Sequence, residues 1–286
     1  MSFLYVSNLS QNLIEIYFFL DYDTSMKIRR RNQMNPVIVR NVKIGEGIPK
    51  ICVPIVSTTL EEILNEATYL KDIPKDLVEW RADYFQDVFD FEKVREVLAG
   101  LREVLCETPI LFTFRTAKEG GEKEIDASTY LSLNKTAAET GDADLIDVEI
   151  CSDEDTVKAI IEYAHRNHVK VVASNHDFEK TPDKEEIISR LQRMQEMGSD
   201  ILKMAVMPQS RSDVLTLLSA TEEMVRIYAQ KPVVTMSMSG MGLVSRIAGE
   251  VFGSAITFGS AKRASAPGQI PTGELSKILN VLHCSL

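Results

Sequence analysis

Short apolar runs alternate with amphipathic helical patterns from residue 37 onward, and this alternation restricts the fold more than any other feature of the chain. It is typical of βα units arranged around a parallel sheet. Eight strands are expected, at residues 51–56, 77–81, 110–114, 145–150, 170–174, 201–206, 233–236 and 255–258. Between them, apolar residues recur at helical spacing, as in Val157, Ile160, Ile161 and Ala164.

Eight βα repeats in about 250 residues predict a (β/α)8 TIM barrel, an α/β fold whose ring the final helix at 274–283 would close. An open doubly wound sheet is the alternative, but the first strand leads directly into a helix without a glycine-rich phosphate loop. The segment from Pro36 to Gly45 alternates like a β-hairpin, which we expect to cap the bottom of the barrel.

Helix ends carry their own signals. Thr59 and Glu62 fit a capping box, and Ser212 precedes another predicted helix. Gly198 and Gly253 stand where a helix typically ends in a glycine.

Residues 1–25 differ from the rest and predict an N-terminal extension that could be dispensable, followed by one catalytic barrel domain at 26–286. The apolar stretch near residue 14 lacks a preceding basic segment and a cleavage site, and it is too short to span a bilayer. We therefore expect a cytoplasmic protein. Four scattered cysteines without metal-like spacing agree with reduced thiols and no metal site.

The net charge of −10 comes from acidic and basic residues mixed along the chain. This pattern argues against nucleic acid or an anionic membrane as a partner. A small anionic substrate would need a local cluster of arginines.

Lys203 lies inside an apolar strand pattern at residues 201–206. An ammonium in an apolar interior costs several kcal/mol unless it is paired, which favours a depressed pKa and a nucleophilic amine. Such an amine can form a Schiff base with a ketone or aldehyde. The simpler interpretation is a lysine at a strand end that reaches water, and for a lone lysine it would be preferred.

Other polar residues favour the catalytic interpretation, because barrel enzymes carry their active sites at the C-terminal ends of the strands. Each has an ordinary explanation: Glu79 and Arg81 could form a structural salt bridge, and Glu119 lies in a charged turn. Their convergence on one rim is what indicates a site. The candidates are Glu79, Arg81, Arg115, Glu119, His176, Lys203 and Arg246, with a loop at 259–271 that could act as a lid.

From about Pro36 to its C-terminus the chain resembles the type I 3-dehydroquinate dehydratases. The motifs are residues 79–83 (EWRAD), 112–116 (FTFRT), 118–122 (KEGGE), 174–178 (SNHDF), Lys203, Ser245-Arg246 and 267–269 (PGQ). The resemblance implies a barrel, usually a homodimer, that converts 3-dehydroquinate to 3-dehydroshikimate without metal or organic cofactor. This reaction belongs to the shikimate pathway of aromatic amino acid biosynthesis.

The resemblance also implies roles for individual residues. Lys203 would form the Schiff base, His176 would act as base and acid, and Glu119 would orient it. Arg246 would take the substrate carboxylate, and nearby guanidinium groups would help to keep Lys203 unprotonated. The other contacts implied are those of Glu79, Arg81 and Arg115 with hydroxyls and of Ser265 and Gln269 from the lid.

Two alternatives remain open from the residues. A class I aldolase or transaldolase also places a Schiff-base lysine on a barrel strand, and residues 258–260 could supply a phosphate site. The other is a barrel without catalysis that serves as a binding module.

Overall fold

The computed structural model describes residues 34–151, 153–261 and 266–286. The predicted extension at 1–25 and the candidate Ser265 lie outside the described residues.

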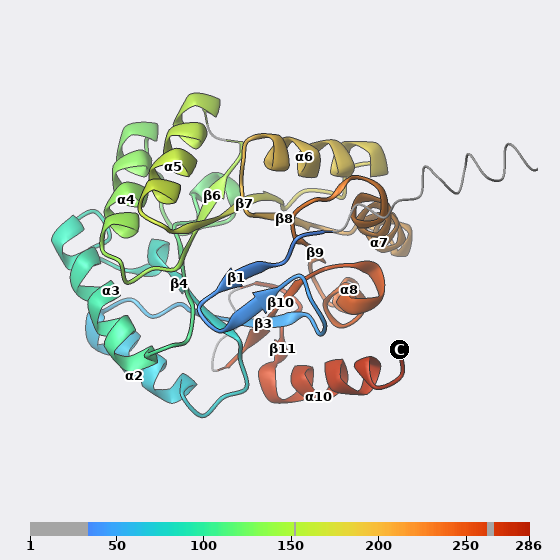
Figure 1. The fold of residues 1–286 in the computed structure, drawn as a ribbon, viewed down its shortest axis with the longest axis horizontal. Coiled ribbons are helices and arrows are strands. Elements are labelled where there is room, and N and C mark those ends of the chain that lie inside the picture. Colours follow the sequence, from blue (N-terminus) through green and yellow to red (C-terminus); the bar gives the residue numbers. More distant parts are fainter. Residues whose placement is uncertain (1–33, 152, 262–265) are drawn as a thin grey trace, which may run out of the picture. The chain divides into compact units, whose positions relative to one another are not determined.

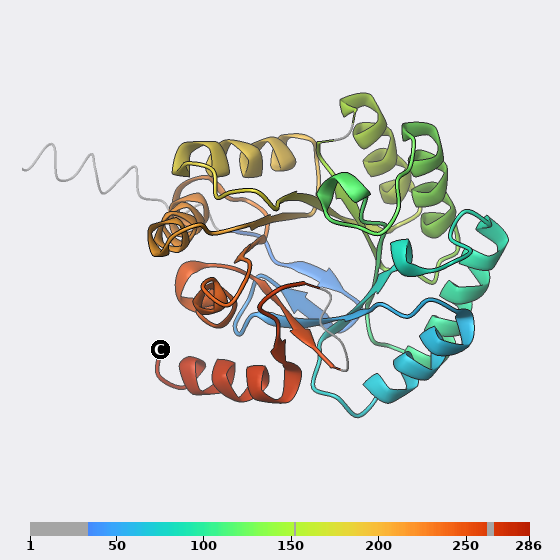
Figure 2. The same cartoon turned by 180° about the vertical axis from the view of Figure 1, so that it is seen from behind.

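Eight parallel strands lie at the centre of the fold, and helices surround them (Figures 1 and 2). The first seven lie side by side in chain order, and the eighth pairs with the first. The strands are β3 (Lys50–Ile55), β4 (Leu77–Arg81), β5 (Ile110–Thr113), β6 (Leu145–Glu149), β7 (Lys170–Asp177), β8 (Ile201–Val206), β9 (Val233–Ser237) and β10 (Ile256–Ser260). Their positions agree with the eight predicted strands to within a few residues at each end.

The last strand closes the ring. β10 pairs in parallel with β3, and on its other side the backbone N–H of Ala255 donates to the carbonyl of Val233 at 2.7 Å. A parallel bridge between Val233 and Ser254 completes the contact with β9. The predicted barrel is therefore confirmed, and the open doubly wound sheet is wrong.

The predicted lid loop at 259–271 ends in a short strand, β11 (Ile270–Pro271). β10 pairs with β3 only as far as Phe258, and β11 pairs in parallel with the last two residues of β10, with Gly259 opposite Ile270. This pairing places the preceding Gln269 next to the end of the barrel.

A two-stranded antiparallel hairpin, β1 (Val37–Val39) and β2 (Val42–Ile44), precedes the barrel. Val37, Val39 and Ile44 are buried and belong to one apolar cluster with residues at the N-terminal ends of the barrel strands, among them Leu77 and Leu145. The hairpin thus covers the bottom of the barrel as predicted, and leaves the C-terminal end for chemistry.

Helices follow the strands and cover the outside of the barrel (Figure 1). They are α2 (Leu60–Leu70), α3 (Phe91–Leu105), α4 (Ala127–Glu139), α5 (Glu154–Arg166), α6 (Lys184–Glu196), α7 (Arg211–Glu223), α8 (Leu243–Ile247), α9 (Gly249–Phe252) and α10 (Thr272–His283). Short 3-10 turns span Ala82–Tyr84 and Ala117–Glu119, and a π-helical turn spans Met224–Tyr228. Across the described ranges, none of the helices combines the length and apolarity needed to span a membrane.

The helix ends follow the sequence signals with one exception. Thr59 and Glu62 form the predicted capping box of α2, and Gly198 and Gly253 have φ angles of +91° and +99° after the helices they end. Ser212 was the wrong residue for the start of α7. Ser210 has the extended backbone of a cap, and its hydroxyl accepts the N–H of Asp213 at 3.3 Å.

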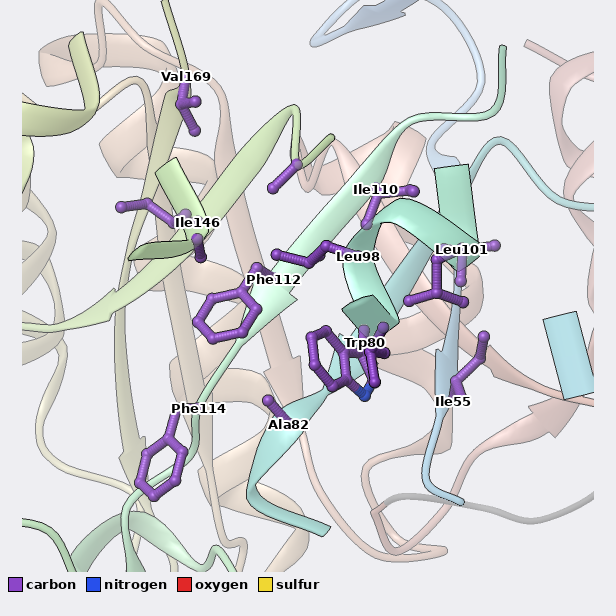
Figure 3. Packing of buried hydrophobic residues seen from close by; sticks show 14 of the residues in the cluster. Ile55, Trp80, Ala82, Leu98, Leu101, Ile110, Phe112, Phe114, Ile146 and Val169 are labelled. Carbon is purple, nitrogen blue, oxygen red and sulfur yellow. The ribbon is translucent and has the colours of Figure 1, made fainter. Parts of the chain in front are cut away.

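The main apolar core lies between the outer face of the strands and the helices. Trp80 from β4 and Phe112 from β5 meet edge to face at 5.5 Å, and Leu98 and Leu101 of α3 belong to the same cluster (Figure 3). Because side chains alternate along a strand, the outward Trp80 requires its neighbours Glu79 and Arg81 to point into the barrel. The core thereby positions two of the candidate site residues.

Candidate active site

One cavity at the C-terminal end of the barrel brings the predicted residues together. Eight of the nine predicted residues line it, namely Glu79, Arg81, Arg115, Glu119, His176, Lys203, Arg246 and Gln269. The ninth, Ser265, is outside the described residues. Apolar side chains complete the walls, including Phe178, Met236, Met238 and Phe258. The structure therefore brings eight of the candidate residues to one cavity.

Lys203 lies inside the barrel near the middle of β8 and is 4% exposed, so the interpretation as a strand-end lysine reaching water is wrong. Its Nζ lies 3.0 Å from Asp147 Oδ2, 3.7 Å from Glu79 Oε1 and 4.6 Å from the centre of the Phe258 ring. Among the described residues its closest charged partners are thus carboxylates, whereas the resemblance implied guanidinium groups. Asp147 and Glu79 are placed to stabilise an ammonium at this position.

Arg115 anchors a buried charge network beside the lysine. Its guanidinium donates to Asp147 Oδ1 at 2.7 Å, to Glu149 Oε1 at 2.8 Å and to Ser174 Oγ at 3.0 Å. Burial alone would raise the pKa of Asp147, but the positive charges of Arg115 and Lys203 hold that pKa well below its usual range. Asp147 is therefore ionised at neutral pH and links the two cations.

Arg81 does not pair with Glu79 as one interpretation suggested. Its Nε and Nη2 each donate to a carboxylate oxygen of Asp83 at 2.8 Å. Glu79 instead accepts a hydrogen bond from Thr113 at 2.9 Å. The 3-10 turn after β4 brings Asp83 back toward Arg81, which sequence spacing alone did not indicate.

His176 and Glu119 form a hydrogen-bonded pair. Glu119 Oε2 lies 2.9 Å from Nδ1 of the ring and accepts the backbone N–H of His176 at the same distance. The turn that presents Glu119 is tight, because a Cβ at Gly121 would lie 1.9 Å from the carbonyl oxygen of Arg115. The contact of Nδ1 with Glu119 leaves Nε2 as the ring nitrogen available to the cavity.

The surroundings of this pair oppose charge on both members. Burial and the neighbouring Glu149 carboxylate raise the pKa of Glu119 to about 8. Burial, together with the positive charges of Arg115 and Lys203, lowers the pKa of His176 well below its ordinary value. His176 is therefore a neutral imidazole at neutral pH, which is the form that can accept a proton.

Arg246 has no carboxylate partner within the described ranges. Its side chain is 2% exposed, Nη2 donates to the carbonyl of Pro267 at 3.1 Å, and Nη1 contacts the sulfur of Met236 at 3.8 Å. Its buried Nε has no hydrogen-bond acceptor among those residues, and burial lowers its pKa to about 10. A buried guanidinium in this state attracts an anion from the cavity.

Sequence reasoning missed Asp147, Glu149 and Ser174. Asp147 and Glu149 alternate in the run at 145–150 in the same way as Glu79 and Arg81 in the earlier strand. Two carboxylates that are two residues apart on a predicted barrel strand lie on the same face, and on an otherwise apolar strand that face is expected to be the barrel interior. The sequence therefore contained the signal that places Asp147 and Glu149 in the site.

The fold and the cavity together define a class of protein, the TIM-barrel enzymes with a buried lysine. Here the lysine lies among carboxylates, beside a histidine–carboxylate pair and an arginine that has no carboxylate partner among the described residues. A family model for type I 3-dehydroquinase matches residues 51–285. The chain belongs to this family. It dehydrates 3-dehydroquinate to 3-dehydroshikimate in the shikimate pathway and is a hydro-lyase.

Individual relatives agree over nearly their whole length. The chain is 58% identical to a 3-dehydroquinate dehydratase of Listeria innocua and 55% identical to one of Bacillus licheniformis, over 87% of this chain and 99% and 98% of those proteins. A solved type I 3-dehydroquinate dehydratase of Clostridium difficile, with covalent modified comenic acid, is 54% identical. It has a TM-score of 0.87 over 89% of this chain and 100% of that one. These matches favour the dehydratase over the aldolase alternative.

Proposed function

We propose that the dehydration proceeds through a Schiff base on Lys203, with His176 as the proton-transfer group. The observation that carries this proposal is the shared cavity, which Lys203, His176 and Arg246 line together. The solved Clostridium difficile relative contains covalent modified comenic acid, which supports the presence of a nucleophilic group in that protein.

The first step is attack of the lysine amine on the substrate ketone. Lys203 must lose a proton to do so, and Glu79 Oε1 lies 3.7 Å from its Nζ, whereas the pKa of Asp147 is held too low for that carboxylate to take the proton. The carbonyl oxygen leaves as water and a protonated imine remains. The imine nitrogen withdraws electrons and acidifies the neighbouring carbon.

His176 then removes the proton from that carbon. When Nδ1–H donates to Glu119, Nε2 carries a lone pair and can accept the proton. The electron pair moves into a carbon–carbon double bond and the hydroxyl leaves, taking the proton from His176 as water. Water then hydrolyses the product imine and restores the amine of Lys203.

Substrate recognition is proposed to depend on Arg246, whose Nε has no acceptor among the described residues and whose guanidinium suits a carboxylate. Glu79 and Arg81 line the same cavity and are proposed to contact the hydroxyls. Arg115 is also proposed to contact a hydroxyl, although three of its contacts hold the network together. Gln269 lies in the cavity wall, and we propose that Ser265 joins it from the same loop.

The test is chemical trapping. The protein is incubated with 3-dehydroquinate, reduced with borohydride and digested, and the peptides are weighed. A substrate- or product-sized adduct on Lys203, absent from Lys203→Ala, supports the proposal. Lys170→Ala is the matched control, because Lys170 is on the neighbouring strand β7 and 41% exposed. An adduct at another lysine, or turnover in Lys203→Ala, would contradict the imine.

We also propose that the enzyme is a homodimer in the cytoplasm. α8 contacts both α9 and α10. These three helices expose four apolar side chains, Leu243, Val244, Val251 and Val281. A group of exposed apolar side chains is typical of an interface between protein chains. Light scattering of the wild type and of Val244→Glu would test this, since a monomeric wild type would contradict it.

The four cysteines are free thiols, which agrees with a reducing compartment. Fractionation of cells that express the protein tests the location directly.

A further inference from the structure

A chain of hydrogen bonds connects the outer helix α6 with the catalytic pair. Arg190 of α6 donates from Nη1 to Asn175 Oδ1 at 3.0 Å, and Asn175 donates from Nδ2 to Glu119 Oε1 at 3.2 Å. Asn175 is 3% exposed and immediately precedes His176 in the chain. The route therefore runs from the surface, through one buried amide, to the carboxyl that contacts the base.

The donor character of arginine fixes the orientation of this amide. A guanidinium can only donate, so the amide atom that it contacts must be the oxygen. The amide NH2 then faces Glu119. Arg190 is itself held by Glu186, which accepts from Nε at 2.7 Å on the same helix.

An amide NH2 that faces Glu119 requires Oε1 to accept a hydrogen bond. Oε2 accepts the backbone N–H of His176 and lies against Nδ1. Donors on both oxygens favour the ionised form of the carboxyl group, and when Glu119 is ionised the ring nitrogen beside it must carry the hydrogen. In that arrangement Nε2 of His176 has the lone pair.

We propose that Arg190 and Asn175 are positioning residues that favour the ionised form of Glu119 and so favour the tautomer of His176 that accepts a proton from the substrate. The inference rests on the proposed role of His176 as base. Neither residue touches the cavity, so both act through Glu119.

Other charges act on the same pair. Those that act on Glu119 or His176 are Arg81, Arg115, Asp147, Glu149, Cys151 and Lys203, and Arg190 acts in turn on Cys151. Burial and Glu149 raise the pKa of Glu119 to about 8, whereas Arg115 and the hydrogen bond from Asn175 lower it. Removal of the Asn175 donor therefore leaves Glu119 neutral up to a higher pH than in the wild type. A neutral Glu119 donates to Nδ1 and moves the ring hydrogen to Nε2, where it blocks proton abstraction.

The experiment is the pH dependence of kcat/KM. In Asn175→Leu we expect the acid limb of the profile to move to a pH about one unit higher. On that limb kcat/KM should be about tenfold lower than in the wild type at the same pH, and at high pH the two should be equal. Arg190→Ala should move the limb in the same direction by less, because the freed amide can rotate. Arg190→Lys retains a donor and should restore the profile.

Arg193→Ala is the matched control, since Arg193 lies on the same helix but pairs with the exposed Glu154 at 3.1 Å. Its profile should equal that of the wild type. Adding Arg190→Ala to Asn175→Leu should have no further effect. If Asn175→Leu does not fold, the Arg190 variants provide the test. The Arg190 side chain is 27% exposed, so its replacement should not disrupt the core.

A rate that falls equally at every pH, or independent effects of the two residues, would overturn the inference. Borohydride trapping separates this failure from a failure of the proposed function. An adduct on Lys203 in every variant with unchanged profiles removes only the positioning role, whereas its absence from the wild type removes the imine mechanism.

Discussion

Replacing Arg246 with methionine should stabilise the protein and strongly weaken substrate binding. Burial lowers the pKa of Arg246 from its ordinary 12.5 to about 10, and each pKa unit corresponds to about 1.4 kcal/mol. The folded state favours the neutral form, so the cost of burying the charge is present at every pH below about 10. At neutral pH that cost is about 3 kcal/mol.

The net gain should be smaller than this cost. The variant loses the hydrogen bond from Nη2 to Pro267, which is typically worth about 1 kcal/mol, and methionine fills the apolar part of the site imperfectly. We expect the free energy of unfolding to rise by about 1–2 kcal/mol and the melting temperature by about 2–6 °C. The KM for 3-dehydroquinate should rise about 100-fold or more, because a buried partner of the carboxylate is lost.

Calorimetry and urea unfolding measure the stability, and steady-state kinetics measure KM. Arg226→Met is the matched control, because Arg226 is an exposed arginine paired with Glu222 at 2.6 Å and should be silent in both assays. Substrate should raise the melting temperature of the wild type and leave that of Arg246→Met unchanged. A variant that is less stable than the wild type, or one with an unchanged KM, would refute the reasoning.

Two further substitutions test the catalytic residues and their support. His176→Ala should reduce kcat by about 10²–10⁴-fold, and borohydride should trap a slowly formed, persistent adduct on Lys203; normal turnover would exclude His176 as the base. Asp147→Asn should destabilise the fold by about 3–5 kcal/mol in urea unfolding, because Arg115 and Lys203 lose a shared buried counter-ion. If that variant unfolds at the wild-type urea concentration, the network does not depend on the charge of Asp147.

The barrel could be predicted because its signals are local and repeat. Each strand is a short apolar run with a helix after it, and the hairpin alternates with the period of a strand. The errors occur where the decision depends on distant contacts. β11 forms only through its pairing with the distant end of β10. α7 begins at Arg211 because the hydroxyl of Ser210, two residues earlier than expected, accepts the N–H of Asp213.

The candidate site could be predicted as a set of residues but not as a set of pairs. Strand position and parity place Glu79, Arg81 and Lys203 inside the barrel. They do not show that Arg81 turns to Asp83, or that Lys203 meets Asp147 from a strand two places away in the sheet. Such partners depend on register and on the tilt of neighbouring strands.

Arg115 and Arg246 show why partners matter more than residue types. Both arginines come after a barrel strand, so the sequence alone does not distinguish them. In the structure both are nearly inaccessible to solvent. Arg115 has three carboxylates within 3.7 Å, and its charge is balanced before any substrate arrives. Arg246 has none within the described part of the chain, and its charge remains a cost to the fold until an anion enters the cavity. We propose that the same imbalance, which lowers the stability of the free protein, favours a substrate that carries an anionic group such as a carboxylate, because such a molecule removes the cost.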